Sequence, residues 1–139
     1  MTNQEAFDGI MKWLTRDNGS RCATADAPGA QCLYYDPVTG NRCAIGGHLP
    51  LDISKRLNEA AVGIDGILTQ SDDDLYDVRS LDLELVPLIR DYYDGVEPKL
   101  LDSLQRLHDR AAAWGDNGFK DFDGADLIAS DYDLKPFNR

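Results

Sequence analysis

Cysteine and histidine are the residue types of this chain that most readily support chemistry, and several of them lie in one short stretch. Residues 31–50 read QCLYYDPVTGNRCAIGGHLP and contain Cys32, Cys43 and His48. Cys43 precedes a Gly-Gly pair, where backbone N–H groups at a helix start can stabilise a thiolate, and His48 follows nearby. No Asn or Asp is identifiable that would orient the histidine. We therefore favour Cys43 as a small core residue over Cys43 and His48 as a catalytic pair.

The same residues, together with Cys22, have the composition of a Cys₃His zinc site. Zinc requires four ligands brought into a tetrahedron, and structural sites usually contain closely spaced cysteine pairs. Cys22, Cys32, Cys43 and His48 lack the Cys-x₂₋₄-Cys spacing of such a pair. We therefore expect reduced thiols, no bound metal and no cofactor.

A β-hairpin over residues 31–46 is the element expected to position these side chains. Residues 32–35 and 42–45 flank residues 36–41, where Pro37 and Gly40 favour a reversal of the chain. Two strands alone are only marginally stable, so we expect the hairpin to lay one face on helices. Residues 67–69, Ile-Leu-Thr, are a candidate third strand.

Apolar residues at helical spacing predict about five helices. Thr2 and Glu5 have the form of a capping box before the first, while Pro50 and Pro98 each begin a further one. The helix after Pro98 has the broadest apolar face, and His108 lies on it as an expected core histidine. A last helix is predicted to be capped by Asp123.

These elements predict an α+β fold, with about five helices packed around a small antiparallel hairpin. The 139 residues are expected to form a single domain, 1–139. Residues 71–80 are expected to be an acidic loop and residues 135–139 a frayed tail.

Composition narrows the classes of function. The chain is 42% hydrophobic with a formal net charge of −11, and residues 71–139 hold 17 acidic and 8 basic residues. Such a field repels nucleic acid and anionic membranes and attracts basic protein surfaces. No apolar run is long enough to span a bilayer, and no export signal is recognisable, so we expect a cytoplasmic protein.

Three segments carry a resemblance to known proteins: CLYY at 32–35, GNRCAIG at 40–46 and LQRLHD at 104–109. They resemble uncharacterised small phage-borne and bacterial proteins that have a C-x-Y…G-x-x-C-A-[IVL]-G core and an L-Q-x-x-H-D helix. Many of those proteins have a cysteine where Gly47 stands here. The resemblance covers about a fifth of the chain and implies a phage or mobile-element context, but no activity.

The sequence therefore favours an interaction protein over an enzyme. We expect it to bind and modulate a host protein noncovalently, with Asp72, Asp73, Asp74 and Asp77 facing a basic surface, such as that of a nucleic-acid-binding protein. A thiol-dependent enzyme using Cys43, a protein that sequesters a small ligand and a virion component are the alternatives. The oligomeric state is not predicted.

Overall fold

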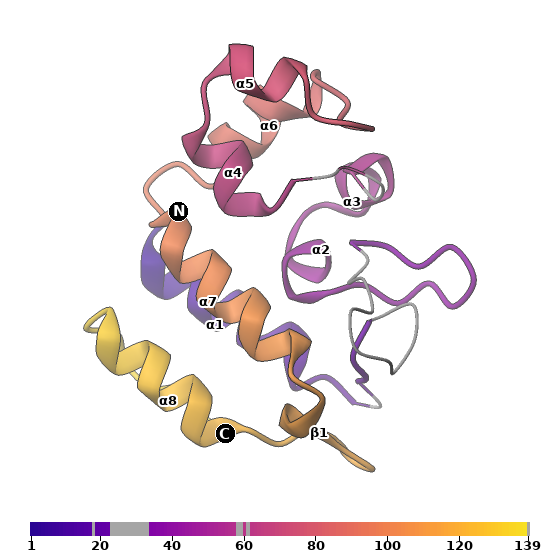
Figure 1. Ribbon diagram of the computed structural model, residues 1–139. Coiled ribbons are helices and arrows are strands. Elements are labelled where there is room, and N and C mark those ends of the chain that lie inside the picture. Colours follow the sequence, from indigo (N-terminus) through magenta and orange to yellow (C-terminus); the bar gives the residue numbers. More distant parts are fainter. Residues whose placement is uncertain (18, 23–33, 58–59, 61, 139) are drawn as a thin grey trace.

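The computed structural model describes residues 1–17, 19–22, 34–57, 60 and 62–138. Within these residues the chain forms eight α-helices, one 3₁₀ helix and one pair of strands (Figure 1). In chain order the elements are α1 (Asn3–Leu14), α2 (Ala44–His48), α3 (Leu51–Leu57), α4 (Ile64–Thr69), α5 (Asp72–Tyr76), α6 (Leu85–Tyr92), α7 (Pro98–Asp109), η1 (Ala111–Ala113), β1 (Trp114–Gly115), β2 (Gly118–Phe119) and α8 (Phe122–Asp131).

Helix α7 is the element on which most others pack. It begins at Pro98, whose fixed φ suits the first turn of a helix, and its apolar residues recur at helical spacing. Helices α1, α2, α4 and α8 all contact it. Its buried face consists of Leu100, Leu101, Leu104, Leu107 and His108. The predicted core position of His108 is confirmed, since its side chain is 1% exposed.

Helix α1 begins as its sequence predicts. The Thr2 hydroxyl accepts the Glu5 N–H at 3.1 Å, and the Glu5 carboxylate accepts the Thr2 N–H at 2.9 Å. These two bonds satisfy N–H groups that have no partner within the helix. They also lower the pKa of the Glu5 carboxyl.

The α+β class is confirmed, but the antiparallel pair is not where the sequence predicts it. Strands β1 and β2 pair Trp114 with Phe119 and Gly115 with Gly118. Gly118 has a φ of +102°, a conformation open to glycine that closes this tight turn.

The predicted hairpin at 31–46 is wrong in its described part. Residues 36–41 do reverse the chain, with the Gly40 N–H donating to the Asp36 carbonyl at 2.7 Å. The following segment is helix α2, in which Ala44, Ile45 and Gly46 are all buried, whereas a strand with one solvent face alternates buried and exposed residues. Cys32 and the rest of the first predicted strand lie outside the described residues.

Two further expectations between residues 64 and 80 are corrected. The candidate third strand at 67–69 is part of helix α4. The expected acidic loop contains helix α5, because the Ser71 hydroxyl accepts the Asp74 N–H at 3.2 Å and caps it. Three aspartates in the first turn interact favourably with the positive end of the helix dipole.

The C-terminal segment docks on α1 instead of fraying at residue 135. The Lys135 N–H donates to Gln4 Oε1 at 2.8 Å, and Phe137 packs against the core. Helix α8 is capped by Asp121 and not by Asp123, because Asp121 Oδ1 accepts the Gly124 N–H at 3.0 Å. In the described ranges no helix has the length and apolarity to cross a lipid bilayer.

The packing on α7 makes a first prediction. Leu104 is fully buried, so Leu104→Ala should lower the free energy of unfolding by about 2–5 kcal/mol, measured by urea denaturation. Leu127→Ala, at a side chain 68% exposed on α8, is the control and should change it by less than about 0.5 kcal/mol. If Leu104→Ala lowered the free energy of unfolding as little as Leu127→Ala, the central place of α7 in the core would be contradicted.

Candidate functional site

Cys43 and His48 lie at opposite ends of helix α2 and have separate hydrogen-bond partners. The Cys43 thiol is buried and its sulfur accepts the Gly46 N–H at 3.3 Å. His48 Nδ1 lies 3.0 Å from the Tyr93 hydroxyl, and its Nε2 faces Gly9, where a Cβ atom would come within 2.6 Å. Among the described residues no hydrogen bond joins the two side chains. The geometry therefore shows no assembled thiol–imidazole pair.

The surroundings of His48 favour uncharged groups. Its ring stacks on the Tyr93 ring with centroids 5.6 Å apart, and burial lowers the pKa of the imidazole. Burial also raises the pKa of Tyr93 well above its usual range, with smaller contributions from Tyr92, Cys43 and Tyr34. His48 and Tyr93 thus form a hydrogen bond between two uncharged groups, which joins α2 to the end of α6.

Three of the four candidate zinc ligands, Cys22, Cys43 and His48, lie among the described residues. Cys32 lies outside the described residues, while Cys22 and Cys43 are both buried. In the part of the chain that the structure describes, no group of three or more His, Cys, Asp or Glu side chains is placed to hold a metal ion.

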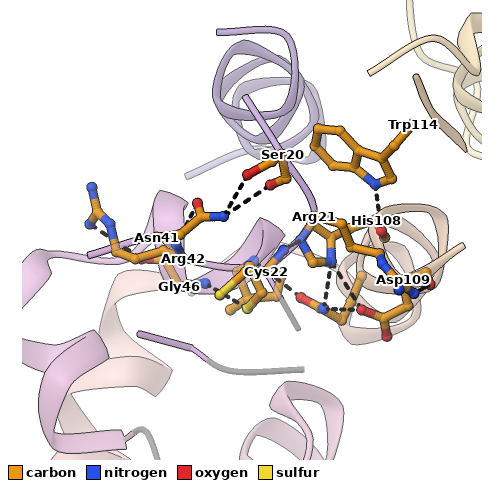
Figure 2. Close-up of polar contacts among 12 residues, drawn as sticks. Ser20, Arg21, Cys22, Asn41, Arg42, Gly46, His108, Asp109 and Trp114 are labelled. Atoms are coloured by element: carbon orange, nitrogen blue, oxygen red, sulfur yellow. Dashed lines mark hydrogen bonds and ion pairs between the residues drawn. The ribbon is translucent and has the colours of Figure 1, made fainter. Parts of the chain in front are cut away.

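The structure joins the two sequence motifs, 40–46 and 104–109, through one polar network (Figure 2). Gln105 Oε1 accepts the Ile45 N–H at 3.3 Å, and its Nε2 donates to Asp109 Oδ1 at 2.9 Å. The same carboxylate oxygen lies 3.0 Å from His108 Nδ1. Nε2 of this histidine accepts the backbone N–H of Cys22 at 3.2 Å.

The hydrogen bonds of this network determine which ring nitrogen of His108 carries the proton and whether the other can act as a base. Because Nε2 accepts an N–H, the proton of the neutral ring must be on Nδ1, where it is donated to Asp109. An Asp–His pair of this kind could orient a general base, but a base needs its free nitrogen within reach of a substrate proton. Here a backbone amide takes that position. The arrangement therefore holds the Cys22 segment against α7.

The sequence placed His108 in the core and gave Gln105 and Asp109 no separate role. Their spacing was the available signal, because residues three and four apart on a helix are neighbours. The contact with Cys22 joins residues 86 positions apart and has no local signature.

Of the four aspartates expected to bind a partner, two line an open groove between α5 and α6. The groove has a volume of about 730 Å³. Its lining consists of Asp72, Asp73, Leu75, Tyr76, Leu83, Val86, Pro87, Arg90, Asp91 and Asp94. Asp74 is exposed on α5 and Asp77 ends that helix, but neither lines the groove.

Arg90 holds this groove together. Its guanidinium donates to Asp72 Oδ1 at 2.7 Å, to the Ile67 carbonyl at 3.0 Å and to the Gln70 carbonyl at 2.7 Å. The side chain thus ties α6 to the end of α4 and the start of α5. Asp72 thus forms an ion pair with Arg90 of the same chain, whereas Asp73 forms none among the described ion pairs.

Apolar side chains are unusually exposed in the same groove. Tyr76 is 74% exposed and Leu83 is 41% exposed, whereas Leu75 is fully buried beneath them. Tyr76, Leu83, Asp91 and Asp94 were not predicted from the sequence. The signal for Tyr76 was its place within an otherwise acidic segment, DDDLYD, where a large aromatic side chain has no polar reason to be.

Comparison with known proteins finds a similarity to a viral protein. The chain is 30% identical over 106 residues to the outer capsid protein VP4 of Banna virus, a match that covers 73% of this chain and 18% of that protein. The chain thus spans less than a fifth of the length of this relative. No family model matches the chain, and no solved structure matches it.

The lowered pKa of His48 makes a second prediction. Below a pH of about 6.5 the unfolded chain takes up a proton that the folded imidazole resists, so the contribution of His48 to stability is complete above that pH and is lost as the pH falls towards the folded pKa. Between pH 7.5 and 5.5, the free energy of unfolding measured by urea denaturation should fall less in His48→Gln than in the wild type. Equal losses in the two proteins would contradict the burial argument.

Proposed function

We propose that this protein acts by noncovalent binding, and that the α5–α6 groove receives a basic, amphipathic segment of a partner protein. The observation that carries the proposal is an exposed apolar groove lined by four aspartates and a single arginine. An acidic rim around apolar anchors is complementary to a segment with leucine-like residues on one face and lysine or arginine on its flanks.

The charges of the groove are available to a partner. Arg90 is held by Asp72 and two backbone carbonyls and forms no described ion pair with the other carboxylates of the groove. Among the described ion pairs none involves Asp73, Asp91 or Asp94. All three residues are exposed. Their negative potential should steer a basic partner and select against acidic ones.

The apolar floor supports the same conclusion. Exposed tyrosine side chains are common anchors of protein interfaces, and burying Tyr76 together with Leu83 would remove apolar area from water. A nucleic acid is disfavoured as an occupant because its phosphates would meet the aspartates and the net charge of −11.

The likeness to a viral capsid protein supports a virus-related setting. We place the binding in the cytoplasm of a host cell, where a phage-borne or mobile-element protein would modulate a host protein by covering its basic surface. A virion component is the second candidate, favoured by the words outer capsid in the name of the relative. The groove would then contact a basic segment of another virion protein.

A peptide of stated composition tests the groove. The probe is a fluorescent amphipathic peptide of about 14 leucine and lysine residues, and its affinity is measured by fluorescence anisotropy at about 50 and 300 mM salt. Asp73→Asn/Asp91→Asn should weaken binding about five- to tenfold at low salt and much less at high salt. Tyr76→Ala should weaken it at both salt concentrations.

A matched control separates the groove from the net charge. Asp116→Asn/Asp131→Asn removes two exposed carboxylates outside the groove and should leave the affinity within about twofold. Asp72 is left unchanged because its replacement would remove the ion pair with Arg90. Equal weakening by both double variants, together with no effect of Tyr76→Ala, would show that the peptide responds to overall charge alone.

A further inference from the structure

Two arginines share one tryptophan ring at the end of helix α1. The Arg16 guanidinium carbon lies 3.7 Å from the centre of the Trp13 ring, and that of Arg42 lies 4.6 Å from it. The ring is fixed in place, because its Nε1 donates to the Arg42 carbonyl at 3.1 Å and any side chain at Gly47 would overlap it. Two cations are thus held close together in a protein of strongly negative net charge.

Neither guanidinium has a carboxylate partner among the described residues. Arg16 donates to the Trp13 carbonyl and to Asn41 Oδ1, both at 2.7 Å, and Arg42 donates to the Gly46 carbonyl at 3.4 Å. All three acceptors are neutral. Burial and, to a smaller extent, the neighbouring Arg42 lower the pKa of Arg16. Like charges this close are costly unless an anion balances them.

Arg16 also lines a polar cavity of about 430 Å³. The other lining residues are Trp13, Ser20, Arg21, Cys22, Asp36, Thr39, Gly40 and Asn41. The Asn41 amide donates to the carbonyl and the hydroxyl of Ser20, both at 3.1 Å, and so closes one wall of the cavity (Figure 2). Hydroxyl and guanidinium groups are the donors that recognise oxyanions.

From this cavity and from Arg16 and Arg42, neither of which has a carboxylate partner among the described residues, we propose that the Arg16 pocket binds the phosphate group of a small molecule or free inorganic phosphate. Arg16 supplies guanidinium donors and Ser20 supplies a hydroxyl, while Arg42, which lies outside the lining of the cavity, adds positive potential from its place on the Trp13 ring. This site is distinct from the α5–α6 groove, with which it shares no lining residue.

Asp36 sets the strength of the site. Its carboxylate lines the same cavity and is held in the turn by the Val38 N–H at 2.9 Å and the Thr39 hydroxyl at 2.8 Å. These bonds lower its pKa, so it stays ionised and opposes a bound anion. Asp36→Asn retains the Oδ1 acceptor and removes the charge, and it should therefore tighten phosphate binding.

Calorimetry with inorganic phosphate and, separately, adenosine monophosphate tests the proposal on the full chain. Arg16→Gln should weaken binding about tenfold or more, since it removes charge-assisted hydrogen bonds. Arg42→Gln should weaken it, and Asp36→Asn tighten it, each about two- to threefold. Arg106→Gln is the control, because Arg106 is 77% exposed and pairs with Asp102 on α7. It should change the affinity by less than about twofold.

The two probes also identify the source of the phosphate. Tighter binding of adenosine monophosphate favours a small phosphorylated molecule, and binding of inorganic phosphate alone favours the free ion. Absence of saturable binding of either probe up to about 10 mM would overturn the proposal. Equal weakening by Arg16→Gln and Arg106→Gln would do the same. If Arg16→Gln does not fold, the other two variants test the proposal. Weaker phosphate binding by Arg42→Gln together with tighter binding by Asp36→Asn would support it, and unchanged affinities in both would overturn it.

Discussion

A buried histidine on the apolar face of α7 constrains much of the structure around it. His108 is 1% exposed, so both of its ring nitrogens need partners inside the protein. Asp109 supplies one partner and the Cys22 amide the other. The Trp114 indole donates to the His108 carbonyl at 2.8 Å and brings the small sheet to the same helix end. The buried His108 side chain thereby fixes where the distant Cys22 segment lies, and the backbone of the same residue positions the neighbouring sheet.

A second set of polar contacts builds the groove away from that centre. Arg90 ties α6 to α4 and α5, and the exposed Arg56 contacts Asp82 at 2.7 Å and Glu84 at 3.2 Å. The ion pairs of Arg56 are screened by water and are worth little in stability. Arg90 matters more, because its backbone acceptors orient three short helices. These bonds fix how α4, α5 and α6 lie around the groove.

The parts of the fold that the sequence predicted depend on local signals. The capping box at Thr2 and Glu5 and the start of α7 at Pro98 are set by residues within one turn of each other. The turn of the predicted hairpin at 31–46 is present, but the hairpin itself is wrong. Its second predicted strand is instead a helix capped by Cys43. Helix α5 was not predicted, although Ser71 and three aspartates are a favourable helix start, because a run of polar residues is equally typical of a loop.

The candidate site was only partly predictable for a similar reason. Charge composition indicated the acidic half of the chain, yet it could not separate Asp72, which pairs with Arg90, from Asp73, which is available to a partner. That distinction depends on tertiary contacts between residues 18 positions apart. The arginine pair on Trp13 likewise joins α1 to residue 42 and has no signature in composition.

Amide hydrogen exchange across the whole chain, with and without the leucine–lysine peptide, tests the binding role of the groove most directly. The account predicts that the peptide slows exchange in α5 and α6 and leaves residues 43–48 and 105–109 unchanged. Slowed exchange confined to residues 43–48 and 105–109, or none anywhere at saturating peptide, would contradict it.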